Sequence, residues 1–224
     1  MEVWESTKNQ NLPAGFEVEW IVQEDGPNPQ LETILPSDRR ISYAANNRQY
    51  GAATTRNLGL ARATGMWVMS LDEDDTLTES AISLLLKPLR IGSHRGWSCG
   101  AAEKFDDTTG QVLEVLRPDF PAGYVAAGVP YDRWVATGRF PVLASHVLYP
   151  MDKVRAVGGW PAQARSEDAG LLLAISRDNA GWVDHHVVLK YRSHDHQNTK
   201  QAWNIAVREQ VALTMRMAYG PLSK

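Results

Sequence analysis

The sequence predicts an α/β fold in which a mostly parallel sheet is flanked by helices. Two short apolar runs, 18–23 (VEWIVQ) and 66–71 (MWVMSL), have the pattern of buried strands, and each continues directly into an acidic turn. The segment 51–64 between them favours a helix. Strands alternating with helices at this spacing are typical of a parallel sheet. Ligands bind such sheets at the carboxyl ends of the strands, where both acidic turns fall.

Local signals predict the remaining elements of the first half. Gly65 is well placed to end the helix that precedes the second apolar run. Thr76 and Glu79 have capping-box spacing, so we expect a helix over 79–90. A short strand is expected at 41–44.

The second half has a different pattern. Strands at 96–105 and 111–116 flank an Asp-Asp-Thr-Thr-Gly turn and are expected to form a hairpin. Segment 118–141 is rich in Pro, Gly and aromatic residues without a clear period, which predicts a long loop that contributes to a binding site. The other predicted elements are helices at 151–157 and 167–179, a strand at 182–191 and a terminal amphipathic helix at 200–219.

Composition limits the class of protein. The 224 residues suffice for one domain with a sizeable core, and the net charge of -3 gives no general attraction to nucleic acid. The single cysteine, Cys99, excludes an internal disulfide and fits a reducing compartment. No apolar run approaches the roughly 20 residues of a membrane span, and the first residues lack a signal-peptide pattern. We therefore expect a cytoplasmic protein without a transmembrane segment.

The acidic run after the second apolar strand is the strongest chemical signal. Carboxylates at Asp72 and Asp74 could share a divalent cation, because Mg²⁺ and Mn²⁺ prefer oxygen ligands. Such a cation could bridge two phosphates. A solvated acidic loop at the positive end of the next helix is the alternative, and the run alone does not exclude it.

Two other acidic pairs are candidates with equally ordinary alternatives. Glu24 and Asp25 could accept hydrogen bonds from a base or ribose, or could form a plain Asp-Gly turn. Glu167 and Asp168 open a predicted helix. A carboxylate there could act as a general base, or could simply complement the helix dipole.

Four further residues are weaker candidates. His194 could supply a metal ligand or a proton donor, although it also fits a polar loop. Arg56 could meet a phosphate or lie exposed on a helix. Trp160 and Trp134 could stack on a sugar ring of the acceptor, but large aromatic residues more often belong to a core.

Taken together, these motifs resemble glycosyltransferase family 2, whose members are inverting enzymes of the GT-A fold. Their order and spacing are more specific than any one of them. The resemblance implies one domain with a Rossmann-like sheet, a nucleotide-binding half at 1–95, an acceptor-binding half at 96–198 and a C-terminal helix at 199–224. The six motifs read here, in order, IVQEDG, AATTRNLG, VMSLDEDD, GGWP, SEDAG and YRSH.

The resemblance implies roles for the donor-side residues. Asp25 resembles the acid that recognises the nucleotide base, with Glu24 where the family often has Asp. Asp72 and Asp74 resemble the DxD pair, in which one carboxylate touches the nucleotide and the other a Mn²⁺ or Mg²⁺ ion; Asp75 is expected to assist. The implied donor is a nucleoside diphosphate sugar.

The resemblance also implies a mechanism. Asp168, with Glu167 beside it, resembles the base that deprotonates an acceptor hydroxyl for a single displacement with inversion. His194 occupies a position that approaches the metal or diphosphate in some relatives. The base and sugar of the donor are left open, and the acceptor could be a glycan, a lipid-linked sugar reached at a membrane surface, a protein or a small molecule. The oligomeric state is also left open.

The sequence departs from the family pattern at its beginning. Members usually start with an apolar strand and a Pro-x-Tyr-Asn-like turn, whereas this sequence begins inside the helix that should follow them. The resemblance implies that a central strand and part of the nucleotide floor are missing from it. Three explanations stay open: a start further upstream, another segment that fills the gap, or a chain that is not fully active.

Two other functions fit parts of the sequence. The segment DEDDTL matches the Asp-x-Asp-x-Thr motif of haloacid-dehalogenase-like phosphatases, although that motif normally ends the first strand of its domain and strands precede it here. The second alternative is a non-catalytic relative that binds a nucleotide or a partner protein.

Overall fold

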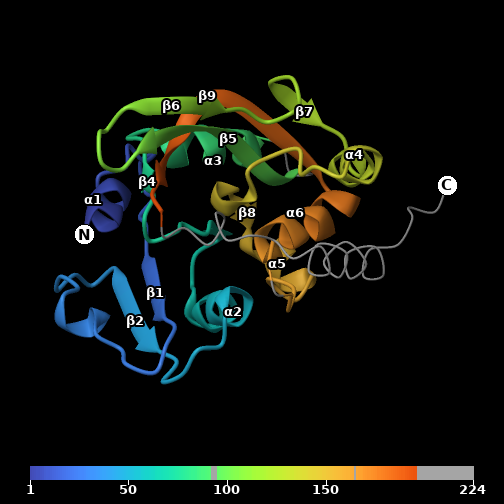
Figure 1. Ribbon diagram of the computed structural model, residues 1–224. Helices are drawn as coiled ribbons and strands as arrows, with labels where there is room; N and C mark the ends of the chain where they lie inside the picture. Colours follow the sequence, from blue (N-terminus) through green and yellow to red (C-terminus); the bar gives the residue numbers. More distant parts are fainter. Residues whose placement is uncertain (92–94, 164, 196–224) are drawn as a thin grey trace.

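The computed structural model describes residues 1–91, 95–163 and 165–195, and Figure 1 shows the order of its elements. The helices are α1 (Glu2–Lys8), α2 (Ala52–Arg62), α3 (Ala81–Ile91), α4 (Val129–Thr137), α5 (Met151–Ala156) and α6 (Glu167–Asp178), with 3-10 turns η1 (Leu31–Thr33) and η2 (Ala144–His146). The strands are β1 (Trp20–Glu24), β2 (Ile41–Ala45), β3 (Trp67–Val68), β4 (Thr76–Leu77), β5 (Arg95–Asp106), β6 (Val112–Leu116), β7 (Gly123–Val125), β8 (Tyr149–Pro150) and β9 (Ala180–Ser193).

The described strands form a mixed arrangement. β1 and β2 pair in parallel as a two-stranded sheet, and β3 pairs with β8 in antiparallel orientation. The largest sheet has the order β4-β9-β5-β6, with β7 added beside β9. Its two long strands, β5 and β9, run parallel to one another, whereas β4, β6 and β7 pair with them in antiparallel orientation. The protein is therefore an α/β fold, as the sequence predicts.

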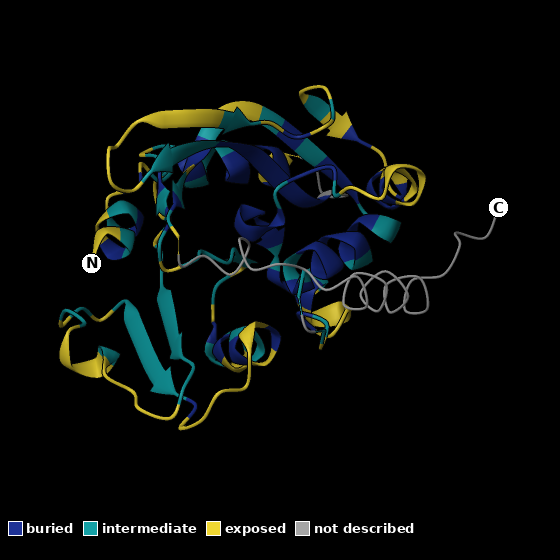
Figure 2. Cartoon of the chain, in the orientation of Figure 1, coloured by how far each residue is buried: buried dark blue, intermediate teal, exposed yellow. Residues whose placement is uncertain are grey.

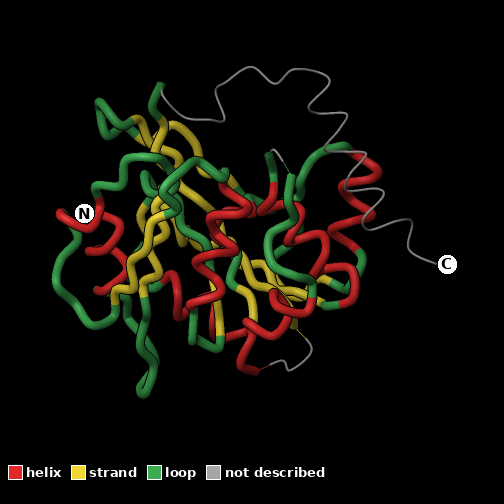
Figure 3. The backbone as a smooth tube through the Cα atoms, turned by 90° about the horizontal axis from the view of Figure 1, so that it is seen from below, coloured by secondary structure: helices red, strands yellow, loops and turns green. Residues whose placement is uncertain are grey.

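Helices cover the large sheet. α3 and α6 both pack against β5 and β9, and the view from below shows helices on both sides of the strands (Figure 3). Burial is deepest around β5 and α6, while β1 and β2 are only partly buried (Figure 2). Among the described residues, none of the helices has the length and apolar character needed to cross a bilayer.

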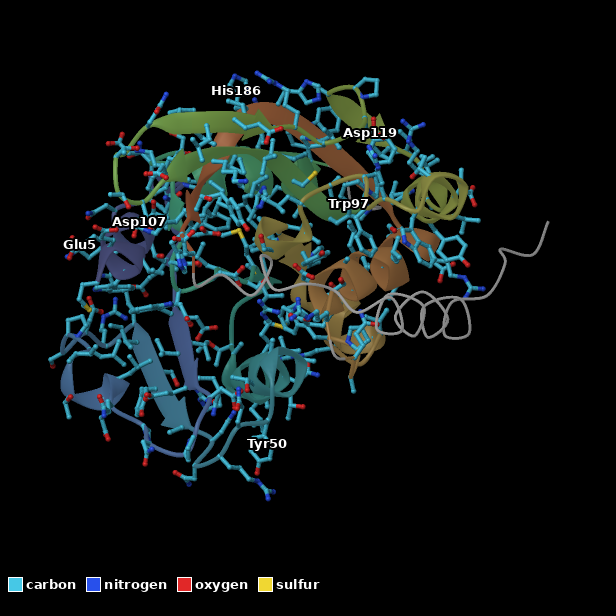
Figure 4. The ribbon with its side chains drawn as sticks, in the orientation of Figure 1. Glu5, Tyr50, Trp97, Asp107, Asp119 and His186 are labelled. Atoms are coloured by element: carbon cyan, nitrogen blue, oxygen red, sulfur yellow. The ribbon has the colours of Figure 1, made fainter. Side chains whose placement is uncertain are left out.

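A close approach between the two long strands organises the core. Trp97 on β5 is fully buried and lies directly over Gly181 on β9, where an added Cβ would lie 1.9 Å from the indole ring. Only glycine leaves room for the ring at this position. The same core contains Leu171, Leu172 and Leu173 of α6, so the ring helps to hold the helix that begins at Glu167 (Figure 4).

A buried histidine in this core makes stability depend on pH. His146 is fully buried, and its Nε2 lies 3.2 Å from the Gly100 carbonyl oxygen, to which it donates a hydrogen bond. Burial lowers the pKa of His146 to about 4, and the bond to Gly100 offsets part of that effect. Between pH 6.5 and pH 4, His146 is protonated in the unfolded chain but stays neutral in the folded chain. The free energy of unfolding therefore falls as the pH drops from about 6.5 towards 4.

We expect wild-type protein to lose about 2 kcal/mol of unfolding free energy between pH 7 and pH 5 through this histidine alone, because about 1.4 kcal/mol corresponds to each pH unit. His146→Gln removes the titrating group and should reduce the pH dependence by that amount. Urea denaturation of both proteins at the two pH values measures the difference. Equal pH dependence in the two proteins would contradict the prediction.

Most predicted elements are present with shifted ends. The hairpin is formed by β5 and β6, the predicted strands at 41–44 and 182–191 are β2 and β9, and helices α2, α5 and α6 occur where expected. The predicted strand at 66–71 is shorter, because only Trp67–Val68 pairs with β8. The predicted terminal helix at 200–219 lies outside the described residues.

Two predictions for local structure are wrong. The segment 118–141 is not one loop, because it contains β7 and α4. Pro130 near the start of α4, with left-handed glycines at Gly128 and Gly138, provides the signals that begin and end that helix. The capping box at Thr76 does not form either: Thr76 enters β4, which pairs with β9, and α3 begins at Ala81.

Candidate active site

The acidic run lies in a turn between β3 and β4. The Asp75 backbone N–H donates to the Asp72 carbonyl at 3.2 Å, which closes the turn. β4 then pairs with the end of β9, so the chain segment that carries His194 is placed beside the acidic turn. The sheet topology therefore brings together two motifs that are more than a hundred residues apart in the sequence.

Arg56 joins the acidic turn to the amino end of α6. Its Nη2 donates to Asp72 Oδ1 at 2.8 Å, and its Nη1 contacts the Glu167 carboxylate. The pKa of Asp72 is raised, first by burial and then by the negative charges of Asp168 and Asp74, although Arg56 opposes this shift. One guanidinium is thus surrounded by carboxylates from two predicted motifs.

Asp168, the predicted general base, lies at the start of α6. It follows Ser166 and Glu167 at the start of α6, and its Oδ1 accepts a hydrogen bond from the Ala169 backbone N–H at 2.8 Å. Burial raises the pKa of Asp168, and the neighbouring Glu167 charge raises it further, against the effect of Arg56. A raised carboxyl pKa increases the basicity of the carboxylate that takes up a proton.

Asp74 and His194, both predicted metal ligands, are in direct contact. His194 Nε2 donates to Asp74 Oδ2 at 2.9 Å. Neighbouring ligand atoms around an octahedral cation also lie about 3 Å apart, so the two atoms could share one ion once Nε2 has lost the proton that it donates to Asp74. No group of three or more His, Cys, Asp or Glu side chains that could hold a metal occurs in the described part of the chain. Two protein ligands suffice where substrate phosphates complete the coordination shell.

Asp75 supports the turn from inside. Its side chain is buried, and its Oδ1 accepts the Arg192 backbone N–H at 2.9 Å. Burial raises the pKa of Asp75 to about 7, the hydrogen bond from Arg192 lowers it, and the charges of Asp74 and Asp72 raise it. Asp75 therefore connects the acidic turn to the end of β9.

Asn57 joins two of the six motifs, a role that its place in the sequence does not indicate. Its Nδ2 donates to the Trp160 carbonyl at 2.8 Å, and its Oδ1 accepts the Trp160 backbone N–H at 2.9 Å. Gly159 has a φ of 81°, and an added Cβ there would lie 2.2 Å from Asn57 Oδ1. The Gly-Gly-Trp segment thus docks against α2 and places Arg56 opposite α6.

The acids after β1 are engaged in local hydrogen bonds. Asp25 accepts from the backbone N–H groups of Tyr50 and Gly51 at 2.8 and 2.9 Å, and from Asn46 Nδ2 at 2.9 Å. Burial alone would raise the pKa of Asp25, but these hydrogen bonds hold it below its usual value. Asp25 therefore fixes the start of α2 as well as lying at the end of β1.

Glu24 also holds a loop. Its two oxygens accept the backbone N–H groups of Gln30 and Leu31 at 2.8 and 2.9 Å, and the Tyr43 hydroxyl at 2.7 Å. These bonds lower the pKa of Glu24 against the opposing effect of burial. Recognition of a base by Glu24 and Asp25 stays a prediction.

Both tryptophans predicted to contact an acceptor lie in the core. Trp160 is 4% exposed and Trp134 is 6% exposed. The Trp134 ring stacks on Phe140 at 6.2 Å between centroids and contacts Tyr131 at 5.7 Å. Their observed contacts are those of core packing, the alternative considered for both from the sequence.

A hollow of about 310 Å³ lies beside the acidic turn. It is lined by Met1, Glu2, Val3, Glu73, Asp74, Asp75, Thr76 and Arg192. A larger hollow of about 610 Å³ lies outside β2 and contains none of the predicted site residues. Of these two hollows, the smaller one therefore adjoins the predicted metal ligand Asp74.

The chain thus has an α/β fold in which carboxylates of the acidic turn and of the start of α6 lie close together around Arg56. The model of Glycosyl transferase family 2 matches residues 2–130, which is more than half of the sequence. The chain belongs to glycosyl transferase family 2. No curated protein matches the sequence.

Solved structures of TarS from S. aureus share the fold. TarS 1-349 has a TM-score of 0.63 and 17% identity, over 85% of this chain and 56% of that one. TarS 1-349 in complex with UDP-GlcNAc has a TM-score of 0.68 and 16% identity, over 97% and 61%. TarS has a TM-score of 0.62 and 15% identity, over 100% and 41%. This chain thus spans less than two thirds of each.

Proposed function

We propose that this protein transfers a sugar from a nucleoside diphosphate sugar to an acceptor hydroxyl, with inversion at the anomeric carbon and with a divalent cation. Family membership supports glycosyl transfer. The observation that carries the proposal is the double contact of Arg56 with Asp72 and Glu167, because it holds the acidic turn next to the carboxylate suited to act as base.

The protein's own groups have distinct tasks in this proposal. Asp168 takes the proton from the acceptor hydroxyl as its oxygen forms the new bond to the anomeric carbon from the face opposite the diphosphate. Arg56 keeps Asp72 and the start of α6 at a fixed separation. Asp25, at the end of β1, faces the nucleoside.

Asp74 and His194 would hold Mn²⁺ or Mg²⁺ through Oδ2 and Nε2, the atoms that lie 2.9 Å apart. Such a cation, when bound, supplies neutralisation of the charge that develops on the departing diphosphate. The donor set of one carboxylate and one imidazole leaves room for phosphate oxygens and water.

The donor proposed first is a uridine diphosphate sugar, because similar TarS structures hold UDP-GlcNAc and UDP. The acceptor class is not specified by any contact of the described residues. The family match includes the DEDDT segment, so that segment belongs to the glycosyltransferase pattern and a phosphatase is not proposed.

Calorimetric titration with UDP and with UMP, each with and without Mn²⁺, tests the proposed site. We expect Mn²⁺ to strengthen UDP binding about tenfold or more and to have little effect on UMP, because UMP lacks the diphosphate whose charge a bound cation would neutralise. A donor-sugar screen by product analysis then tests transfer. Binding of UDP without any transfer or hydrolysis would favour the non-catalytic relative.

Equal binding of UDP with and without Mn²⁺ would remove the metal from the proposal. Absence of binding to UDP and to other nucleoside diphosphates would contradict the donor site itself. An Asp119→Asn variant is a suitable control, because Asp119 is exposed and lies far from the acidic turn, near β7 (Figure 4).

A further inference from the structure

Arg192 belongs to the YRSH motif, in which the resemblance gives a role to His194 alone, and it holds the acidic turn. It lies near the end of β9, two residues before His194. Its Nε donates to the Asp74 carbonyl oxygen at 2.7 Å, while its backbone N–H donates to Asp75 at 2.9 Å. With the contact between His194 and the Asp74 carboxylate, the end of β9 meets the turn at three points.

The other nitrogens of the guanidinium are anchored on two further elements. Nη1 donates to Asp107 Oδ1 at 2.6 Å, in the turn between β5 and β6, and Nη2 contacts the Glu2 carboxylate of α1. The guanidinium carbon lies 5.1 Å from the centre of the Phe105 ring. Figure 4 shows Asp107 at the end of the sheet next to α1. Each nitrogen therefore has its own acceptor on a different part of the chain.

This arrangement requires arginine. The planar guanidinium presents donors in a fixed fork, so anchoring two nitrogens on Asp107 and Glu2 fixes the direction in which Nε points. That direction determines where the Asp74 carbonyl sits, and with it the side chain of Asp74. A lysine has one ammonium on a flexible stem and cannot make the three contacts at once.

We propose that Arg192 is a positioning residue that holds the Asp74 side chain beside His194, so that both side chains can bind one divalent cation. The proposal rests on the proposed function, in which this pair holds the cation. Groups that orient a ligand without touching the metal typically change metal affinity by about 10- to 100-fold when they are removed. Glu2 and Asp107 act through Arg192 and should have smaller individual effects.

The test is calorimetric titration of UDP into the full chain, with and without Mn²⁺, for wild-type protein and four variants. We expect Arg192→Ala to weaken Mn²⁺-dependent UDP binding about 10- to 100-fold and Arg192→Lys to weaken it nearly as much. UDP binding without Mn²⁺ should be unchanged, which a general loss of structure would not allow. Asp107→Asn should give a loss of a few fold, because it removes one anchor of the fork.

Arg133→Ala is the matched control, since Arg133 on α4 forms an exposed ion pair with Asp119 at 2.6 Å. It should bind UDP and Mn²⁺ as wild-type does. If Arg192→Ala fails to fold, the double variant Glu2→Gln and Asp107→Asn decides the question, because both carboxylates are at the surface while Arg192 itself is retained. That double variant should show the same selective loss of the Mn²⁺-dependent part.

The outcomes separate the two proposals. If Arg192→Ala folds and Mn²⁺ strengthens its UDP binding as much as in wild-type, the role of Arg192 is overturned and the proposed function is left intact. Where Arg192→Ala does not fold, the same result in the double variant has the same meaning. If Mn²⁺ does not change UDP binding to the wild-type protein, the proposed metal site is overturned, and with it the role of Arg192. Equal losses with and without Mn²⁺ would show that Arg192 serves structure alone, which also overturns it.

Discussion

Asp168→Asn is expected to lower kcat about a thousandfold while UDP binding stays within a few fold of wild-type. Asparagine keeps the shape of the side chain and its contact with the Ala169 N–H, but an amide cannot take up a proton. General-base catalysis contributes about 10²- to 10⁴-fold in enzymes of this kind. Because burial and the Glu167 charge raise the pKa of Asp168, wild-type kcat/KM should rise with pH through that raised value. The asparagine variant should lack this rise.

Steady-state kinetics with the donor identified by product analysis measures both quantities. Asp178→Asn is the matched control, because Asp178 is exposed at the other end of the same helix. It should retain wild-type turnover and the same pH profile. Wild-type turnover in Asp168→Asn would instead transfer the role of base to another group and remove the main argument for the proposed mechanism.

The acidic positions of this site could be predicted because each follows a local pattern. Asp72 and Asp74 come after an apolar strand, and Asp168 opens a helix after a Gly-Gly-Trp segment. Local pattern also predicted the hairpin of β5 and β6. These features depend on neighbouring residues in the sequence, which is the information that hydrophobic periodicity and capping signals contain.

The partners of these residues could not be predicted in the same way. Arg56 contacts Glu167, which is 111 residues away, and Asn57 contacts Trp160, which is 103 residues away. Nothing in the spacing of either motif indicates that the two will meet. Arg56 was expected either to bind a phosphate or to lie exposed on a helix, whereas it is engaged by two carboxylates. Its contacts arise from packing of α2 against α6, a tertiary property.

The wrong predictions have a related cause. Thr76 has the capping signal, but pairing of β4 with β9 satisfies its backbone groups in a strand instead. Tertiary pairing therefore overrides a local preference of about 1 kcal/mol. In α4 the reverse happened: Pro130 and Gly138 carried helix-boundary signals within a stretch whose composition indicated a loop.

Asp74→Ala is expected to lower kcat/KM about a thousandfold at saturating Mn²⁺, and His194→Ala to lower it less. Both side chains would contact the cation through the atoms that lie 2.9 Å apart. Removing the carboxylate takes away the only formal charge of the pair, and a hard cation depends on oxygen ligands more than on imidazole. A metal ion stabilises a leaving diphosphate by several kcal/mol, and losing that stabilisation corresponds to a decrease in rate of about a thousandfold.

Kinetics over a range of Mn²⁺ concentrations separates the two variants. His194→Ala should shift the Mn²⁺ concentration for half-maximal activity upwards and recover much of its rate at high Mn²⁺, because Asp74 still provides an oxygen ligand. Asp74→Ala should not recover. Asp119→Asn should match wild-type throughout, since its carboxylate pairs with Arg133 on α4. An unchanged Mn²⁺ requirement in His194→Ala would contradict the metal-ligand role of His194. The imidazole would then only donate a hydrogen bond to the Asp74 carboxylate, and Asp74 would hold the cation without it.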